Sequence, residues 1–291
     1  MNESMNCPYL VCNATVYWYE ERCSKCGKDV GFPNVREVGC DEERVALHRR
    51  YESALDVGQK RGAQDQIRAF ASAVESISHA VINTWASYLF QFLNDPRQTY
   101  ANYSLQTSAG TRRPASMGND RNRRGTEGIL FGHYAERIHH AALSLDGSAL
   151  SSYGDEDCCF TIADVTADSK ATVLQENSYK FIHSHTLLPG NEIPLGYRAV
   201  WSERHKLAVA KLAVQIDKTT PPSSFPGLLL YSVGNRDTDE YLEVHIYGSF
   251  DNQAVEAVKI PKPGTATLDK QADLKRIRDL ARRNSKGYTE V

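Results

Sequence analysis

The chain has 291 residues, of which 41% are hydrophobic and 24% are charged, the balance of an ordinary globular protein with a packed core. The net charge of -2 predicts neither a nucleic-acid nor a membrane partner, so any electrostatic recognition must come from local clusters. No apolar run approaches the ~18 residues that span a bilayer, and residues 1–12 lack the pattern of an export signal. We therefore expect a cytoplasmic protein with reduced thiols and no membrane partner.

Four of the seven cysteines form two pairs near the start of the chain, Cys7-x4-Cys12 and Cys23-x2-Cys26, with a β-prone stretch between the pairs. Structural zinc takes four such ligands from two tight turns. The spacing predicts a zinc ribbon over residues 1–38, with the metal supplying its folding energy. Because four cysteines leave no open coordination position, this zinc would be structural. Four unrelated buried cysteines are the alternative.

Residues 41–95 are expected to be helical. Acidic residues from Asp41 onward suit a helix N-terminus. Apolar residues recur every three or four positions over residues 67–92, which predicts one long second helix. Asn94-Asp95-Pro96 is a strong stop signal for that helix.

Residues 96–127 lack periodicity and are expected to form an Arg-rich loop. Loops of this length are often functional or disordered. The arginines could contact phosphates, and a solvated linker is the alternative. The five arginines are Arg112, Arg113, Arg121, Arg123 and Arg124.

Residues 128–262 predict an α+β domain, because short strands and few helices are separated by many Gly, Pro, Asp and Asn residues. Helices are expected over 129–145 and around 206–215. Strands are expected over 160–163, 171–174, 199–201, 228–233 and 241–247.

Residues 268–291 predict a basic C-terminal helix or tail. Seven Lys and Arg residues lie between positions 270 and 286, and Leu274, Ile277 and Leu280 would form one apolar face. Such a helix could bind RNA or an acidic face of a partner, and a solvated surface helix is the alternative.

The strong catalytic signatures of P-loop NTPases, dinucleotide-binding folds, α/β-hydrolases, zinc proteases and zinc deaminases are absent from the sequence. Four short polar motifs remain, at expected strand ends. In the last of them, strand alternation places Tyr241, Glu243 and His245 on one face. The motifs are Arg137-Ile-His139-His140, Ser151-Ser152-Tyr153-Gly154, Gln175-Glu176-Asn177-Ser178 and the strand 241–247.

The order of these motifs, an Arg/His pair, then Ser-Tyr-Gly, then a late strand with Glu before Gly, resembles the ADP-ribosyltransferase family over roughly residues 128–262. The resemblance implies a split pair of small twisted sheets that grips NAD. It implies an NAD-dependent ADP-ribosyltransferase that acts on RNA or protein, as a bacterial toxin or anti-phage effector. An antitoxin-like inhibitory protein would then be a partner.

The resemblance also implies roles for particular residues. Arg137 or His139 would orient NAD through its phosphates or ribose, in a catalytic set of the Arg–Ser–Glu or His–Tyr–Glu type. Ser152 and Tyr153 would lie on the nicotinamide side, with Tyr153 stacking, and Ser178 is a further candidate NAD-binding residue. The sequence does not decide whether the neighbouring His140 faces the pocket instead.

Glu243 would be the catalytic carboxylate, because a fixed negative charge stabilises the oxocarbenium ion that develops as the nicotinamide–ribose bond breaks. Family members that modify protein side chains often carry Gln or Glu two residues earlier, where this chain has Tyr241. An aromatic ring can stack on a base, which leaves a nucleic-acid acceptor open. Glu176 is the next candidate for the carboxylate.

Two other functions compete with this one. A non-enzymatic protein could bind nucleic acid through the ribbon, the arginines and the basic tail. A nuclease toxin could use His139, His140, His183 or His185 as general acid and base. If residues 183–185 are extended, His183 and His185 share a face and also suit a second metal site. A role as a partner scaffold is the remaining possibility.

Overall fold

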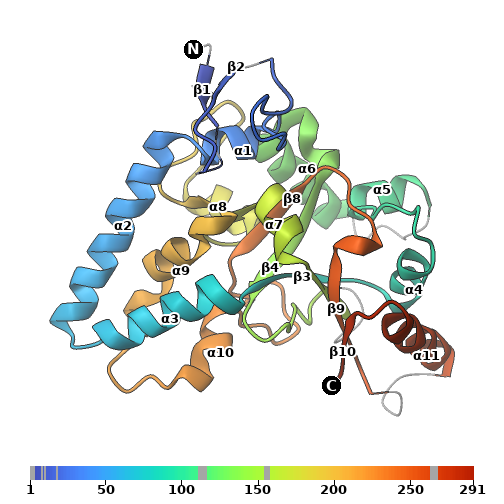
Figure 1. The fold of residues 1–291 in the computed structure, drawn as a ribbon. Coiled ribbons are helices and arrows are strands. Elements are labelled where there is room, and N and C mark those ends of the chain that lie inside the picture. The colour runs from blue at the N-terminus through green and yellow to red at the C-terminus, as the bar shows by residue number, and fades with distance from the viewer. Residues whose placement is uncertain are drawn as a thin grey trace.

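The computed structural model describes residues 4–7, 9, 11–17, 19–110, 117–153, 158–262 and 268–291. A small two-stranded sheet carries the N-terminus, and one eight-stranded sheet forms the centre of the molecule (Figure 1). The strands are β1 (Ser4–Asn6), β2 (Thr15–Tyr17), β3 (His79–Asn83), β4 (Ile138–Ser144), β5 (Cys159–Ile162), β6 (Ala171–Leu174), β7 (Arg198–Val200), β8 (Glu243–Tyr247), β9 (Val255–Ile260) and β10 (Gly287–Glu290).

Helices surround the central sheet. The α-helices are α1 (Pro33–Val38), α2 (Asp41–Lys60), α3 (Gln64–Ile77), α4 (Ala86–Asn94), α5 (Tyr103–Ser108), α6 (Met117–Phe131), α7 (Asp164–Lys170), α8 (Ser178–Ser184), α9 (Arg204–Leu212), α10 (Phe225–Leu229) and α11 (Leu268–Arg283). Short 3-10 helices are η1 (Gly132–Arg137), η2 (Trp201–Glu203), η3 (Ala213–Gln215), η4 (Pro222–Ser224) and η5 (Asn252–Ala254). Among the described helices, none combines the length and the apolar character needed to cross a membrane.

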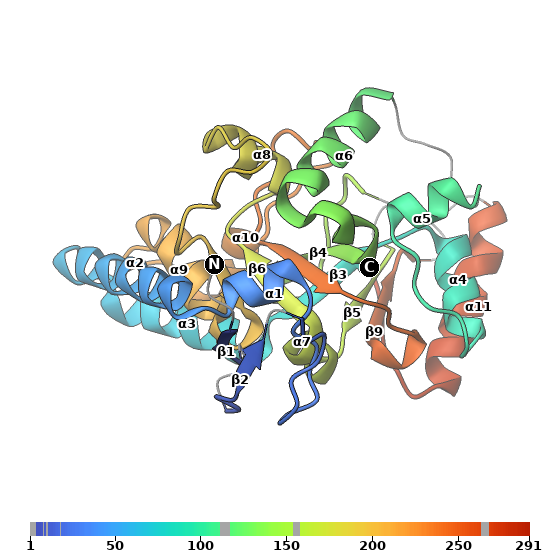
Figure 2. The same cartoon turned by 90° about the horizontal axis from the view of Figure 1, so that it is seen from above.

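The eight strands are ordered β10-β9-β5-β3-β4-β8-β6-β7, and only the pair β10–β9 is parallel. Helices α2, α3 and α9 pack together at one end of the sheet, and α4 and α11 pack together at the other (Figures 1 and 2). The mixed helix and strand content expected from the sequence is confirmed. The strands form one sheet of eight, where the resemblance implied a pair of small sheets.

The single long helix predicted over residues 67–92 is wrong in its middle. Helix α3 ends at Ile77, β3 follows, and α4 begins at Ala86. Residues 80–82 are three consecutive buried apolar positions, as in a strand covered on both faces. The apolar spacing continues across all three elements, so periodicity alone could not reveal the strand.

Two further predictions in the second half of the chain are wrong. Residues 129–145 were expected to be helical, but Ile138–Ser144 forms β4 between β3 and β8. Residues 228–233 were expected to be a strand, but α10 occupies Phe225–Leu229, where Pro226 suits the first turn of a helix. The strands expected near 160, 171, 199 and 243 and the helix near 206 are confirmed.

Residues 96–127 are not one loop, because α5 and most of α6 lie within them. Helix α6 contains glycines that lower helix propensity, yet its last turns bury Glu127, Leu130 and Phe131. This packing outweighs the propensity. Of the expected Arg cluster, Arg112 and Arg113 lie outside the described residues, and the other three lie on α6.

The basic C-terminal helix is confirmed as α11, but its apolar face is already used. Leu274, Ile277 and Leu280 are buried, and α11 packs against α4. Its exposed basic side chains, including Lys275 and Arg283, are what remains available to a partner.

The N-terminal ribbon of β1, β2 and the cysteine turns packs next to α1 and α7, where strand β8 ends (Figure 2). The hydroxyl of Tyr9 bonds to that of Tyr247 at the end of β8 and lies 2.9 Å from the Ser169 carbonyl oxygen. Lys28 Nζ lies 2.7 Å from Asp168 Oδ2. The ribbon is thus tied to the strand that carries Glu243.

Candidate functional site

The four N-terminal cysteines converge, as their spacing predicts. The Sγ atoms of Cys7 and Cys26 are 3.7 Å apart, those of Cys12 and Cys23 are 3.5 Å apart, and all four lie within 4.8 Å of one another. A tetrahedral zinc with Zn–S bonds of about 2.3 Å would place its sulfurs about 3.8 Å apart. The cluster could therefore hold a metal ion such as zinc.

The second cysteine pair lies in a tight turn suited to metal binding. Gly27 has φ +71°, a left-handed conformation that favours glycine, and its N–H donates to the Cys23 carbonyl at 2.8 Å. Burial acts to raise the pKa of Cys23, but hydrogen bonds from the backbone N–H groups of Cys26 and Lys25 outweigh it and lower the pKa to about 7. The turn therefore favours the thiolate of Cys23, the form that binds metal, while burial raises the pKa of Cys26.

A second cluster, the His–Glu cluster of Glu127, His140, Glu243 and His245, lies where β4, β8 and α6 meet. His140 on β4 pairs in register with His245 on β8, and Ala142 pairs with Glu243, so the three polar side chains share one face. His140 Nδ1 is 2.5 Å from Glu243 Oε1, and His245 Nε2 is 3.7 Å from the same oxygen. From α6, Glu127 Oε1 reaches to 3.2 Å of His140 Nε2.

The start of α8 holds Glu243 from the other side. The backbone N–H of Ser178 donates to Glu243 Oε2, and Ser178 Oγ lies 3.1 Å from His245 Nε2. Asn177 caps the helix by accepting from two backbone N–H groups of its first turn. The same side chain donates to the Tyr241 hydroxyl at 2.6 Å. Both carboxylate oxygens of Glu243 are thereby fixed.

The charges of this cluster follow from these contacts. Burial acts to lower the pKa of His140, but Glu243 and Glu127 outweigh it and raise the pKa to about 9. Burial acts to raise the pKa of Glu243, but His140 outweighs it and holds the pKa well below the usual range. Burial lowers the pKa of His245. At neutral pH, His140 is an imidazolium, Glu243 is a carboxylate and His245 is neutral.

The ligand atoms of His140, Glu243 and His245 also lie within 4.8 Å of one another, close enough for a metal ion. A metal could bind there only by displacing a proton from His140, because an imidazolium has a proton on each ring nitrogen and offers no lone pair. Without a metal, the contacts of this cluster form a charge network.

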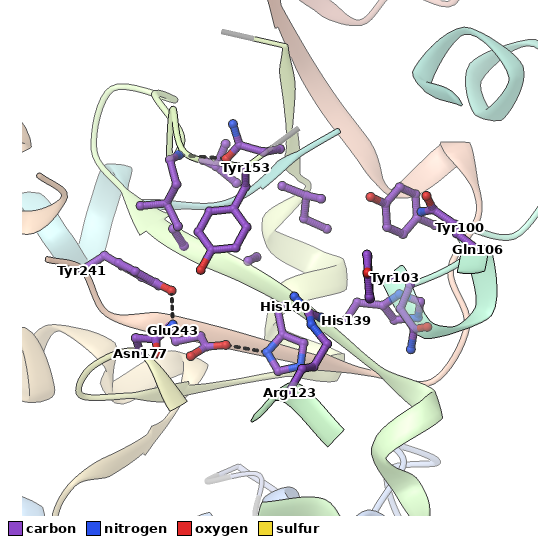
Figure 3. Close-up of a pocket in the computed structure, with 17 residues that line it drawn as sticks. Tyr100, Tyr103, Gln106, Arg123, His139, His140, Tyr153, Asn177, Tyr241 and Glu243 are labelled. Atoms are coloured by element: carbon purple, nitrogen blue, oxygen red, sulfur yellow. Dashed lines mark hydrogen bonds and ion pairs between the residues drawn. The ribbon is translucent and has the colours of Figure 1, made fainter. Parts of the chain in front are cut away.

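Glu243 and His140 lie on the wall of a cleft that opens to solvent (Figure 3). The cleft itself has a volume of about 130 Å³ and continues into open solvent at its mouth. Typical small-molecule sites are larger, at roughly 300–1,000 Å³, so a ligand would lie partly in the open mouth. Aromatic rings and polar groups share its walls, including Tyr100, Tyr103, Tyr153, Tyr241, Asn177 and Arg123. Arg123 is partly exposed, and its guanidinium lies 4.7 Å from the Tyr103 ring centroid.

The structure brings some of the predicted NAD-site residues to this cleft. Glu243 and Tyr153 line it, and Ser178 supports Glu243 from behind. Burial raises the pKa of Tyr153, and the charge of Glu243 raises it further. The hydroxyl of Ser152 instead donates to Asp239.

Arg137 and His139 are not brought to Glu243. Arg137 ends η1, is exposed and lies 6.0 Å from the Phe32 ring centroid, outside the cleft lining. His139 borders the cleft, but successive side chains of a strand point to opposite faces, so its ring leaves β4 on the side away from His140. Its ring packs 4.9 Å from that of Phe250, and burial lowers its pKa to about 4. His140 is therefore the member of the motif that meets the carboxylate.

The metal site suggested for His183 and His185 is wrong, because this segment is helical rather than extended. His183 lies in α8 with Nδ1 2.8 Å from the Tyr179 carbonyl oxygen, and His185 Nδ1 is 3.0 Å from that of Phe181. In each ring, Nδ1 lies against a backbone carbonyl four residues earlier in the chain.

The sequence analysis did not identify Glu127, the cleft-lining tyrosines Tyr100 and Tyr103, or the place of Arg123 in the cleft wall. No local motif marks Glu127, since its partner His140 lies on a different element. No protein-family model matches this chain, and a search of curated proteins finds no match at a significant level. Function is therefore inferred from the geometry of the cleft and the His–Glu cluster.

Proposed function

We propose that the cleft binds NAD and that the protein is an NAD-dependent ADP-ribosyltransferase with Glu243 as its catalytic carboxylate. The observation that carries this proposal is the charge and fixed position of the Glu243 carboxylate. It is a buried anion, fixed by His140 and by the Ser178 N–H, at the wall of an aromatic cleft. A carboxylate held in this way is already oriented before charge develops on the substrate.

The remaining cleft residues suit the other parts of NAD. Tyr153 and Tyr241 offer aromatic surface beside Glu243 for the flat nicotinamide ring. Arg123 replaces Arg137 as the cation for the pyrophosphate, since a guanidinium can bind phosphate oxygens through two hydrogen bonds. RNA and protein both remain candidate acceptors, within the toxin or anti-phage role implied by the resemblance.

The proposed reaction breaks the bond between the nicotinamide nitrogen and ribose C1′. The bonding electrons leave with nicotinamide, and C1′ acquires oxocarbenium character that Glu243 stabilises. An acceptor oxygen or nitrogen then forms the new bond to C1′ and releases its proton. No oxidant or metal enters this balance.

A transfer experiment tests the proposal. The purified protein is incubated with NAD labelled in the adenylate part and with cell lysate, and RNA and protein are then extracted separately. We expect label in one fraction and release of free nicotinamide. Glu243→Gln keeps the shape and removes the charge, so its rate should fall by roughly 10²–10³.

Glu176→Gln is the matched control, because Glu176 lies near α8 but outside the cleft lining. It should retain the parental rate, and the melting temperatures of both variants should stay near that of the parent. Label in neither fraction, or a fully active Glu243→Gln, would overturn the assignment.

We also infer that the metal of the cysteine cluster is zinc and that its role is structural. All four ligands come from the protein, which leaves no position open for substrate.

A further inference from the structure

Glu127 lies behind the cleft, on the turn of α6 that follows Arg123. Its side chain is 7% exposed, and its Oε1 is 3.2 Å from His140 Nε2 and 3.4 Å from Arg123 Nη1. The other ring nitrogen of His140, Nδ1, is 2.5 Å from Glu243 Oε1. His140 therefore lies between two carboxylates, one at each ring nitrogen.

We propose that Glu127 is a positioning residue, which shares His140 with Glu243 and thereby keeps the imidazole doubly protonated and the Glu243 carboxylate fixed at the cleft wall. A neutral imidazole carries one N–H and can donate to only one of the two carboxylates. The other carboxylate would then lose its charged imidazolium partner and keep only its second contact, Arg123 for Glu127 or the Ser178 N–H for Glu243. The 3.2 Å contact at Nε2 is an ion pair without hydrogen-bond geometry, so Glu127 acts on His140 through its charge. The role in catalysis rests on the proposed function, while the ion pairs stand on the distances.

The other groups around His140 are consistent with this charge distribution. On β8 it faces Glu243 and the neutral His245, and on α6 it faces Glu127 and, at 6.1 Å between centroids, the ring of Phe131. Its neighbour His139 on β4 is neutral because burial lowers its pKa. Arg123 supplies the fourth charge, so two cations balance two carboxylates.

A pH dependence follows from this arrangement. Because the two carboxylates raise the pKa of His140, the imidazolium persists through neutral pH and is lost as the pH rises through about 9. Above that pH Glu243 loses its charged partner, and turnover should fall. Removing the charge of Glu127 lowers the pKa of His140, so this alkaline loss should move to lower pH.

The test is nuclear magnetic resonance of histidine-labelled full-length protein, with His140 assigned through its absence in His140→Asn. In the parent protein, both ring nitrogens of His140 should be protonated at pH 7. In Glu127→Gln, the titration of His140 should move down by about one pH unit or more, and the alkaline limb of kcat should move with it. The control Glu136→Gln removes a nearby exposed charge on η1 and should change neither curve.

The inference is overturned if His140 is neutral at pH 7 in the parent, or if it titrates identically in Glu127→Gln. The measurement on the parent decides the matter even if Glu127→Gln does not fold. If NAD is not cleaved but the titration shifts as expected, the proposed function fails and the bonding role of Glu127 stands.

Discussion

At the scale of single residues, Asn177 connects the backbone of α8 to the cleft. Its oxygen caps the helix, and its nitrogen donates to the Tyr241 hydroxyl at 2.6 Å. The next residue, Ser178, supplies the N–H that holds Glu243. The placement of Glu243, the proposed catalytic carboxylate, thus depends on one amide side chain that does not itself bond to it.

Replacing Asn177 with Ala should lower the free energy of unfolding by about 1 kcal/mol, the usual cost of losing an N-cap. Turnover should fall as well, because the Ser178 N–H and Tyr241 are no longer held in place. Chemical denaturation and NAD-cleavage rates measure the two effects. Asn284→Ala, at an exposed position after α11, is the control and should change neither. A variant that loses stability but keeps full activity would show that the cap does not serve the site.

Residue-level prediction from the sequence succeeded where the signal is local. The cysteine pairs lie in short turns, and strand alternation alone places Glu243 beside His245. It failed for Glu127, whose partner lies on another element. It also failed for Arg137, which lies three residues before His140 in the same motif but outside the cleft lining. Which neighbour faces a pocket depends on where η1 ends and β4 begins.

At the scale of elements, the ribbon and β8 are joined through their tyrosines. The hydroxyls of Tyr9 and Tyr247 bond to each other, and the hydroxyl of Tyr247 donates to the Ser169 carbonyl at 2.8 Å. Tyr247 lies four residues beyond Glu243 on the same strand. If the cysteine cluster loses its metal and the ribbon unfolds, the end of β8, the strand that carries Glu243, should lose this contact.

Purified protein should contain about one zinc per chain, because four cysteines form one tetrahedral set. Replacing Cys23 and Cys26 with Ser should abolish the zinc and lower the melting temperature, since metal binding supplies folding energy. Metal analysis and thermal denaturation measure both. Cys40→Ser is the control, because Cys40 lies outside the cluster. Zinc-free protein with four freely reactive thiols would refute the site.

Three of the elements that were predicted incorrectly share a physical cause. In β3 and β4 the apolar residues lie in unbroken buried runs, which a periodicity test reads equally well as helix. In α6, contacts with the sheet stabilise a helix that its glycines disfavour. In β3, β4 and α6, contacts with segments distant in the sequence determine the secondary structure. Such contacts cannot be read from one sequence alone.

At the scale of the whole molecule, two helices of this near-neutral chain present exposed basic side chains. Arg121 and Arg124 are exposed on α6, and Lys275 and Arg283 are exposed on α11. These charges give the nucleic-acid hypothesis its physical basis.

If RNA is bound, its affinity should fall steeply with salt, because each neutralised phosphate releases counterions. The double variant Lys275→Glu/Arg283→Glu should weaken binding and flatten the salt dependence. Lys218→Glu, an exposed change in the loop before η4, is the control for a single Lys-to-Glu reversal away from α6 and α11. Titrations at several salt concentrations measure the slope. Affinity that does not respond to salt would show that the basic side chains are only solvated.

The strand order has a kinetic consequence. His140 and Glu243 are 103 residues apart in the chain, yet they lie on neighbouring strands. Closing a loop of that length costs entropy before any contact repays it, and sheets built from such pairings fold slowly. The charge network cannot exist until β4 and β8 have paired, so the proposed activity should be absent through the slow stage of folding. The rate at which activity returns after dilution from denaturant would then report the rate at which β4 and β8 pair.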